Sequence, residues 1–172
     1  TTVNVMQSPE GVAGYYNVPM WSEEHFRLME KSFALMGRLG NDVLGVSAVA
    51  RSVMGDDPVI VFRREGDRFV PDFRFLQRYL ELYNKHAGEP QFLSVHVWNY
   101  GYYYRGFGRD GSKKGVEGET WGETIPVKEL VGDRLVSIEL PMYNRPEAQV
   151  VWRQVMEGVR ECVRKVGWRQ EC

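Results

Sequence analysis

The sequence has little cysteine, little histidine and almost no net charge. Its two cysteines, Cys162 and Cys172, lie near the carboxyl end without a CxxC or Cys/His cluster, which argues against a disulfide framework and a zinc site. Lys and Arg total 22 against 23 for Asp and Glu, so the formal net charge is -1 and no basic field favours a polyanion. We therefore expect no metal site and no nucleic-acid partner.

Long apolar runs and nucleotide motifs are also missing. No run approaches the roughly 20 apolar residues of a membrane helix, so we expect a soluble protein with no membrane partner. The amino end, TTVNVMQSPEG, lacks the regions of a signal peptide. Because the sequence starts at Thr1 without Met, a removed signal peptide and a secreted or periplasmic location stay open. The glycines of RGFGRDG precede no helix, and GxxxxGK[ST] and GxSxG motifs do not occur, so we expect no cofactor.

The composition is globular, and its length of 172 residues suits a single domain over residues 1–172. The clearest helix follows Trp21, where Ser22 is a candidate N-cap and Trp21 with Phe26 fits a hydrophobic staple. Gly40 stands where a left-handed residue ends a helix. The apolar face of this helix is predicted to comprise Phe26, Met29, Phe33, Met36 and Leu39.

Strand and helix patterns alternate along the chain. Apolar strands are predicted at residues 3–9, 42–50 and 91–98. A second helix over residues 73–88 is capped by Asp72, and a third begins near Pro146. Their buried faces are predicted to comprise Phe73, Leu76, Leu80, Tyr83 and Ala87, and Val151, Val155, Val159, Cys162 and Val166. This alternation favours an α/β fold with a parallel sheet and right-handed crossovers.

Two connections between a strand and the next helix each contain a predicted β-hairpin. Residues 59–70 turn near Gly66 and Asp67, and residues 124–140 turn near Gly132 and Asp133. Both hairpins follow the carboxyl ends of strands, where barrel folds place their sites.

The segment Ser94–Gly111, SVHVWNYGYYYRGFGRDG, begins as a strand and continues into aromatic rings and glycines. Alternation places Phe92, Ser94, His96 and Trp98 on one face, and Leu93, Val95 and Val97 on the face toward the helices. In the preceding strand, the same alternation places Leu44, Val46 and Ala48 on the face toward the helices. It places Ser47 and Arg51 on the opposite face, which points inward. Flat rings beside polar groups suit a sugar. The candidate binding residues are Arg51, His96, Trp98, Asn99, Tyr100 and Tyr102.

Each candidate also has a structural interpretation. Any single tyrosine can pack under the loop as readily as it lines a cleft. His96 can be a hydrogen-bonded structural histidine, a substrate ligand or, less readily, a metal ligand. Arg51 can clamp a phosphate or carboxylate, donate to a hydroxyl, or pair with Asp56 or Asp57. The acids Glu10, Asp72, Glu117, Glu119, Glu123 and Glu139 are not paired across a cleft by their spacing.

The chain resembles glycoside hydrolase family 123 and related glycoside-hydrolase-like proteins. The resemblance rests on residues 18–44, on the hairpin leading into residues 70–88, on the strand at 92–99 and on the helix at 145–168. It implies a (β/α)8 barrel with hairpin insertions that cleaves a glycosidic bond, in the founding family a β-linked N-acetylgalactosaminide. It also implies substrate-assisted retention, in which the sugar's acetamido oxygen attacks, one carboxylate orients it and a neighbouring Glu is the acid/base.

In that family the acidic pair follows a later strand, so we expect the catalytic acids beyond Cys172 and assign none here. A complete barrel usually needs about 250 residues. We therefore expect the leading part of a barrel, completed by the rest of the barrel or by a homo-oligomer. The resemblance implies a carbohydrate substrate, and the alternative is a non-catalytic carbohydrate-binding or assembly domain on the same scaffold. Single-stranded RNA binding by the Tyr/Arg/Gly segment is the weakest alternative.

Overall fold

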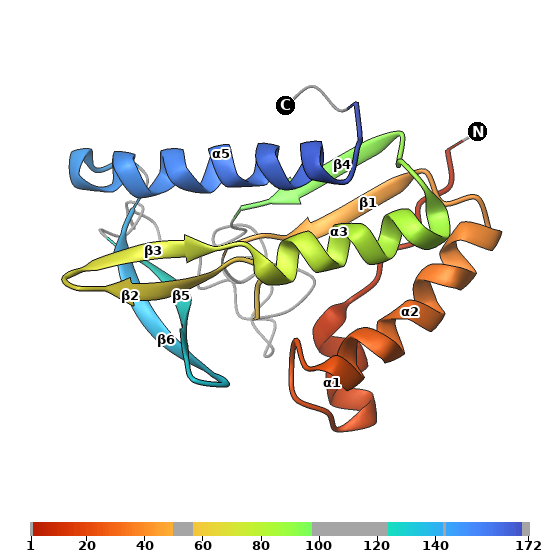
Figure 1. Ribbon diagram of the computed structural model, residues 1–172, viewed down its shortest axis with the longest axis horizontal. Helices are drawn as coiled ribbons and strands as arrows, with labels where there is room; N and C mark the ends of the chain where they lie inside the picture. The colour runs from red at the N-terminus through yellow and green to blue at the C-terminus, as the bar shows by residue number, and fades with distance from the viewer. Residues whose placement is uncertain (1, 50–56, 98–123, 143, 170–172) are drawn as a thin grey trace, which may run out of the picture.

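Two parallel strands and a separate four-stranded sheet are combined with helices in the computed structural model, which describes residues 2–49, 57–97, 124–142 and 144–169 (Figure 1). The parallel pair is β1 (Val43–Ser47) and β4 (Phe92–His96). The second sheet, in the order β3-β2-β5-β6, contains β2 (Val61–Glu65), β3 (Arg68–Asp72), β5 (Thr124–Val131) and β6 (Arg134–Pro141). The helices are α1 (Pro9–Tyr16), α2 (Glu23–Arg38), α3 (Arg74–Ala87), the 3-10 turn η1 (Pro146–Ala148) and α5 (Gln149–Lys165). The expected α/β class is confirmed.

Helix α2 begins as the sequence predicts. The Ser22 hydroxyl accepts the N–H of His25, and the Trp21 and Phe26 rings lie 5.9 Å apart. Gly40 has a φ of 71°, as expected after a helix end. The prediction for Leu39 is wrong: it is 53% exposed, because the helix ends at Arg38 and Leu39 lies in the following turn.

Helix α3 begins one residue later than predicted. Phe73 holds the N-cap position without a side-chain cap, while the Asp72 carboxylate accepts the N–H of Arg74 at 3.0 Å. Leu76, Leu80 and Tyr83 are buried as expected. Phe73 and Ala87 pack against the core while partly exposed, and so do Val151 and Val166 of the last helical segment. That segment starts with Pro146 in η1 and buries Val155, Val159 and Cys162.

The predicted leading strand at residues 3–9 does not form. Val3 accepts the N–H of Asp42 at 2.9 Å, but the N–H of Val5 binds the side-chain oxygen of Asn41 at 2.6 Å. The Asn41 amide in turn donates to the carbonyl of Val43. The Asn41 side chain thus lies between Val5 and β1. Its two hydrogen bonds replace the direct backbone hydrogen bond that a strand at Val5 would form with β1. Helix α1, which was not predicted, then begins after Ser8, whose hydroxyl caps Gly11.

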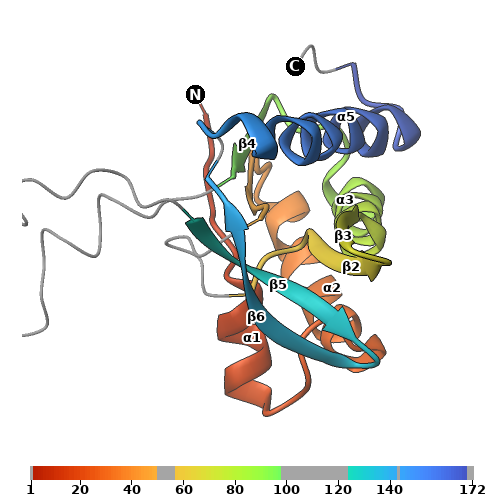
Figure 2. The same ribbon diagram turned by 90° about the vertical axis from the view of Figure 1, so that its left-hand side faces the viewer.

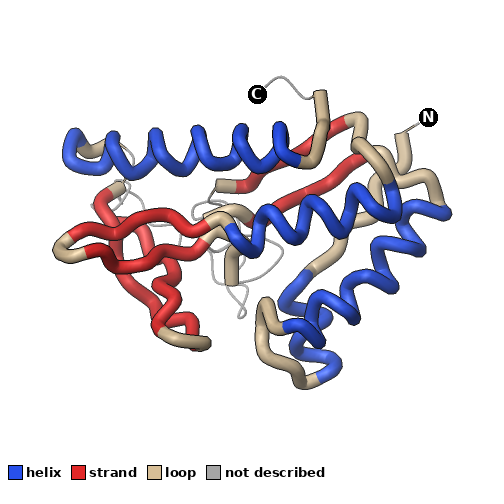
Figure 3. The backbone as a smooth tube through the Cα atoms, in the orientation of Figure 1, coloured by secondary structure: helices blue, strands red, loops and turns tan. Residues whose placement is uncertain are grey.

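Both predicted hairpins are present, with their turns at Gly66 and Gly132, each at a φ of 61°. The sequence did not indicate that they join. β2 and β5 pair in parallel, with Phe62 opposite Glu129, so one sheet contains both hairpins. This sheet lies beyond the carboxyl ends of β1 and β4, toward which their arrows point in Figure 1, and Figure 3 shows the strands of both sheets in red. The described residues place two parallel strands side by side, and closure into a (β/α)8 barrel stays a prediction.

Helices α2 and α3 approach each other closely at one glycine. A Cβ added to Gly37 of α2 would lie 2.0 Å from the carbonyl oxygen of His86 of α3. Tyr79 and Tyr83 of α3 are buried against Phe33 of α2, with edge-to-face ring contacts at 5.1 and 5.6 Å. The aromatic contacts depend on the small residue at position 37, because it sets the distance between the helices.

We predict that Gly37→Ala lowers the free energy of unfolding by roughly 1–3 kcal/mol, since the added methyl group must push the two helix backbones apart. Gly14→Ala is the matched control: this helical glycine has nothing within 4 Å of an added Cβ. Alanine there should stabilise the protein by up to about 1 kcal/mol through helix propensity. Urea unfolding of both variants measures the difference, and a Gly37→Ala protein as stable as wild type would contradict the close contact.

His25 is fully buried where the start of α1 meets the start of α2. Its Nδ1 accepts the N–H of Trp21 at 3.0 Å, and its Nε2 lies 2.9 Å from the carbonyl oxygen of Pro9. A backbone N–H can only donate, so Nδ1 carries no proton and Nε2–H donates to Pro9. The bonds therefore fit the neutral ring. Burial lowers the pKa of His25, and the Pro9 carbonyl opposes this in part.

The protein should lose stability as the pH falls below about 6.5, the ordinary histidine pKa. Below that value His25 takes up a proton more readily in the unfolded chain than in the folded protein, where its pKa is lowered, so protons favour unfolding. The slope approaches at most about 1.4 kcal/mol per pH unit. Urea unfolding between pH 7 and 5 measures it. His25→Gln should flatten the slope and His86→Gln should not; equal slopes in all three proteins would exclude His25 as the cause.

Candidate functional site

The polar face predicted for β4 is present at the carboxyl end of the parallel strands. Ser94 Oγ lies 3.2 Å from His96 Nε2, so these side chains share a face. Ser94 is exposed and His96 is half-buried. In the register with β1, Ser94 lies opposite Gly45 and His96 opposite Ser47. Ser47, Ser94 and His96, here called the polar edge, are therefore neighbours across two strands.

The other face of the same strands is apolar, as alternation predicts. Leu44, Val46 and Ala48 are at most 1% exposed. Leu93, Val95 and Val97 pack against the core cluster. The polar edge therefore stands on a backbone held by buried side chains, which favours a fixed geometry for His96.

The chain that leaves β1 returns to its end at the root of the first hairpin. The N–H of Val59 donates to the carbonyl of Ser47 at 3.0 Å, and that of Ile60 to Ala48 at 2.8 Å. The N–H of Ala48 donates to the carbonyl of His96, also at 2.8 Å. Val59 and Ile60 are at most 1% exposed. The hairpin sheet is thus attached directly to the backbone of the polar edge. Figure 2 shows the molecule from the side on which the hairpins lie.

Of the six predicted binding residues, His96 lies within the described part of the chain. The other five lie outside the described residues: Arg51, Trp98, Asn99, Tyr100 and Tyr102. Three of the acids weighed from the sequence also lie outside it: Glu117, Glu119 and Glu123. Asp57, a possible partner of Arg51, forms an ion pair with Lys128 of β5 at 3.3 Å.

Two buried carboxylates near the hairpins are bound by arginines. Asp72, 6% exposed, lies 2.9 Å from the guanidinium groups of both Arg63 and Arg74. Glu129, 9% exposed, lies 3.6 Å from Arg64. Burial of a carboxylate requires such partners. Both acids therefore hold the hairpin sheet, and neither is arranged as a free catalytic acid.

Lys128 and Glu129 are charged residues of β5 whose ion pairs the sequence analysis missed. Glu129 shares the core-facing parity of Ile125 and Val127 in β5, and a charge at an apolar position was the available signal. Lys128 lies on the other face, where it also donates to the hydroxyl of Ser137 at 3.1 Å. The Lys128–Asp57 pair links the second hairpin to the connection that follows β1.

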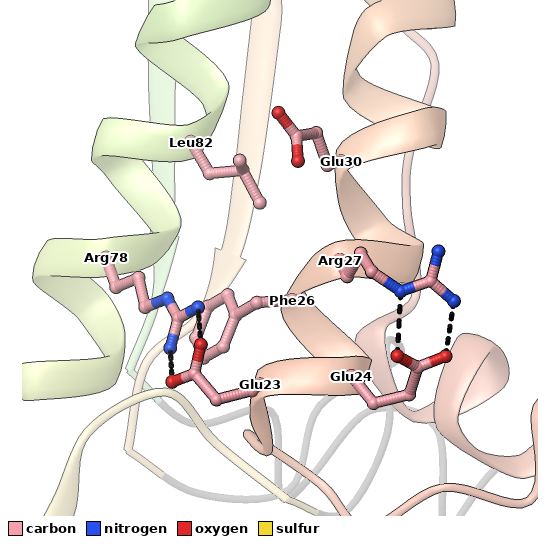
Figure 4. A pocket seen from close by; sticks show the side chains of 7 residues that line it. All are labelled: Glu23, Glu24, Phe26, Arg27, Glu30, Arg78 and Leu82. Atoms are coloured by element: carbon pink, nitrogen blue, oxygen red, sulfur yellow. Dashed lines mark hydrogen bonds and ion pairs between the residues drawn. The ribbon is translucent and has the colours of Figure 1, made fainter.

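A shallow groove of about 300 Å³ lies elsewhere, between α2 and α3 (Figure 4). It is lined by Glu23, Glu24, Phe26, Arg27, Glu30, Arg78 and Leu82. The Arg78 guanidinium binds Glu23 with two nitrogens and lies 4.1 Å from the centre of the Phe26 ring. Arg27 binds Glu24 in the same two-point manner. These exposed ion pairs lie at the surface of the contact between α2 and α3 and stabilise it little. None of the predicted site residues lines the groove.

Neither a metal site nor a membrane segment is found in the described ranges. No three His, Cys, Asp or Glu side chains there are grouped so that they could hold a metal ion. None of the described helices combines the length and the apolar character needed to cross a bilayer.

Comparison with known proteins agrees with the geometry. A solved structure of a family 123 glycoside hydrolase from Clostridium perfringens, described in relation to glycolipid glycan hydrolysis, superposes with a TM-score of 0.62 at 14% sequence identity. The match covers 98% of this chain and 28% of that chain, and at this identity it shows the fold alone. No curated protein matches the chain.

The family model for the catalytic domain of glycoside hydrolase 123 matches residues 6–171. This range includes the helices, the parallel strands and both hairpins described above. The chain belongs to the glycoside hydrolase 123 catalytic-domain family.

Proposed function

We propose that this chain contributes the sugar-binding edge of a glycoside hydrolase that acts on a glycan, with a β-N-acetylhexosaminide cleaved by substrate-assisted retention. The observation that carries the proposal is the family match over residues 6–171. The polar edge at the carboxyl ends of β1 and β4 supports it, because parallel α/β folds bind ligands at that end of their strands.

His96 offers the chemistry that sugar recognition needs. Its Nε2 lies beside Ser94 Oγ, and an imidazole has a second ring nitrogen that can donate or accept according to the tautomer. A sugar hydroxyl both donates and accepts, so it can bind either tautomer. We assign His96 and Ser94 to positioning a hydroxyl group rather than to proton transfer.

The residues that follow His96 complete the proposed site. Trp98, Tyr100 and Tyr102 supply flat apolar faces for the C–H side of a sugar ring. Arg51 and Asn99 supply donors for its hydroxyl or acetamido oxygens. No catalytic acid is assigned to a residue of this chain, because the resemblance implies that the acidic pair follows a later strand. Asp72 and Glu129 are already bound by arginines.

A non-catalytic carbohydrate-binding or assembly domain is the second candidate. The observation that favours it is that arginines bind both Asp72 and Glu129. Among the described residues, the polar edge therefore offers groups for binding, and no acid there is assigned to catalysis. The two functions share sugar binding and differ in bond cleavage.

Hydrolysis of chromogenic β-N-acetylgalactosaminide and β-N-acetylglucosaminide by the whole natural protein tests the proposal. Trp98→Ala should lower kcat/KM roughly tenfold or more, because a lost stacking face costs at least about 1.4 kcal/mol. Phe92→Ala is the matched control: this 56% exposed ring has the same parity at the other end of β4 and should leave kcat/KM unchanged.

Unchanged kinetics in Trp98→Ala would remove Trp98 from the site. Sugar binding without hydrolysis would favour the binding domain, and absence of both would contradict a carbohydrate function altogether.

We further infer that another strand pairs with the outer edge of β4. Within the described ranges β4 pairs with β1 alone, and Leu93 and Val95 remain half-buried while Leu44 and Val46 of β1 are 1% exposed. An uncovered apolar edge is a template for association. The rest of the barrel or a second copy of the chain would supply the missing strand.

Amide hydrogen exchange distinguishes a covered from a bare edge. Phe92 donates to Asp42 of the segment before β1, so by alternation the N–H groups of Leu93 and Val95 point outward. A covering strand should slow their exchange to the level of Phe92, and light scattering tells a second copy from the protein's own chain. A monomer that unfolds cooperatively and exchanges Leu93 and Val95 rapidly would refute the inference.

A further inference from the structure

The connection between α1 and α2 contains two residues with an unusual backbone conformation. Asn17 and Trp21 have φ values of 53° and 58°, and within the described ranges they are the two non-glycine residues with positive φ. Asparagine tolerates this region, whereas a bulky ring such as that of tryptophan is strained there. Such strain persists only where the surrounding structure holds the residue in place.

His25 supplies a contact that holds Trp21. The Nδ1 atom of His25 accepts the backbone N–H of Trp21 at 3.0 Å, and the two rings lie 5.5 Å apart. The Trp21 ring also stacks on Phe75 at 5.7 Å, while its Nε1–H is buried without a partner. The N–H of the strained residue is thus satisfied by one atom, the unprotonated nitrogen of a fully buried imidazole.

Protonation of His25 removes this acceptor, because an imidazolium ring donates from both nitrogens. The bond from Nε2–H to the carbonyl of Pro9 is compatible with the charged ring. At Nδ1, however, the new N–H would face the N–H of Trp21. A buried charge and a buried unpaired N–H are both unfavourable, and the entry of water relieves both. The proton therefore favours a form in which the surroundings of His25 are open.

Helix α1 is the part of these surroundings with little to hold it. Of its eight residues Pro9 and Ala13 are buried, whereas Tyr15 is 84% and Tyr16 53% exposed. Figures 1 and 2 show α1 and the connection at the lower margin of the molecule. Helix α2, by contrast, is anchored in the core cluster along its length. A segment with few buried contacts opens at a lower free energy than the core does.

We propose that protonation of His25 opens residues 9–22 as a local unit, releasing α1 and its connection from α2 while the rest of the fold stays intact. Opening would relieve the strain at Trp21 and give its Nε1–H access to water. Burial lowers the pKa of His25 in the closed form, so the closed form is favoured above about pH 6.5 and loses that advantage below it. The device is independent of the proposed function, since it uses no residue of the polar edge.

Other titratable groups on the elements around His25 can be separated from it. They are Glu10, Tyr15 and Tyr16 of α1, Glu23, Glu24 and Arg27 of α2, and Arg78 and Tyr79 of α3. Hydrogen bonds from the arginines lower the pKa of Glu23 and Glu24, and burial raises that of Tyr79. These three groups therefore keep their charge state between pH 7.5 and 5.5. Glu10 is tested with a variant.

Amide hydrogen exchange of the whole natural protein at pH 7.5 and 5.5 tests the proposal, once rates are corrected for the intrinsic effect of pH. Residues 9–22 should lose up to roughly tenfold in protection at the lower pH, because His25 in the open form binds a proton below about pH 6.5. Residues 74–87 of α3 should keep their protection. Unchanged protection of residues 9–22, or an equal loss in both segments, would overturn the inference.

His25→Gln separates the imidazole from other effects of pH. The glutamine amide offers an acceptor and a donor but takes up no proton in this range, so protection of residues 9–22 should not depend on pH. His86→Gln and Glu10→Gln are the matched controls and should respond as wild type does. An acid response in His25→Gln equal to that of wild type would contradict the proposal.

A measurement on the wild-type protein covers the case in which His25→Gln fails to fold. Nitrogen-15 spectra of the imidazole should show a neutral ring protonated at Nε2 at pH 7.5 and proton uptake at Nδ1 as residues 9–22 lose protection. A ring that stays neutral while protection is lost would exclude His25 as the trigger.

Discussion

The parallel pairing of β1 with β4, which sets Ser47 opposite His96, determines where the rest of the molecule can go. Parallel neighbours end at the same edge, so the connections that follow them leave from one place. Each connection contains a hairpin, and two hairpins starting side by side can share a ladder. The pairing of Phe62 with Glu129 is that shared point. A single register thus accounts for both the polar edge and the four-stranded sheet beside it.

The alternation within β1 and β4 places the side chains that pack in the core on one face and the polar side chains on the other. Leu44 and Val46 meet the core, while Ser94 and His96 occupy the opposite parity. A slip of one residue would exchange the faces, burying the imidazole and exposing the leucine. The cost of burying an unpaired polar side chain opposes such a slip. Packing of the helices therefore also keeps Ser94 and His96 on the face of the strand opposite the apolar core.

Local patterns made helices α2, α3 and α5, the hairpin turns and the faces of β1 and β4 predictable from the sequence. Each depends on neighbours within a few residues, such as Ser22 at a cap or Gly66 in a turn. Helix α1 and the exposure of Leu39 were missed although both depend on nearby residues, whereas the other failures involve partners distant in sequence. The strand expected at residues 3–9 is displaced by the Asn41 amide, which lies 36 residues from Val5. The union of the hairpins likewise requires a pairing that no local period encodes.

Ion pairs supplement the backbone pairing that joins the two hairpins. One register pair, Phe62 with Glu129, joins the two hairpins within the described residues, so the ladder between them is short. Two ion pairs, Arg64 with Glu129 and Lys128 with Asp57, supplement it. Lys128 and Asp57 are each about a quarter exposed, so salt screens their attraction only in part. Directional charge pairs thus stabilise the relative position of the two hairpins.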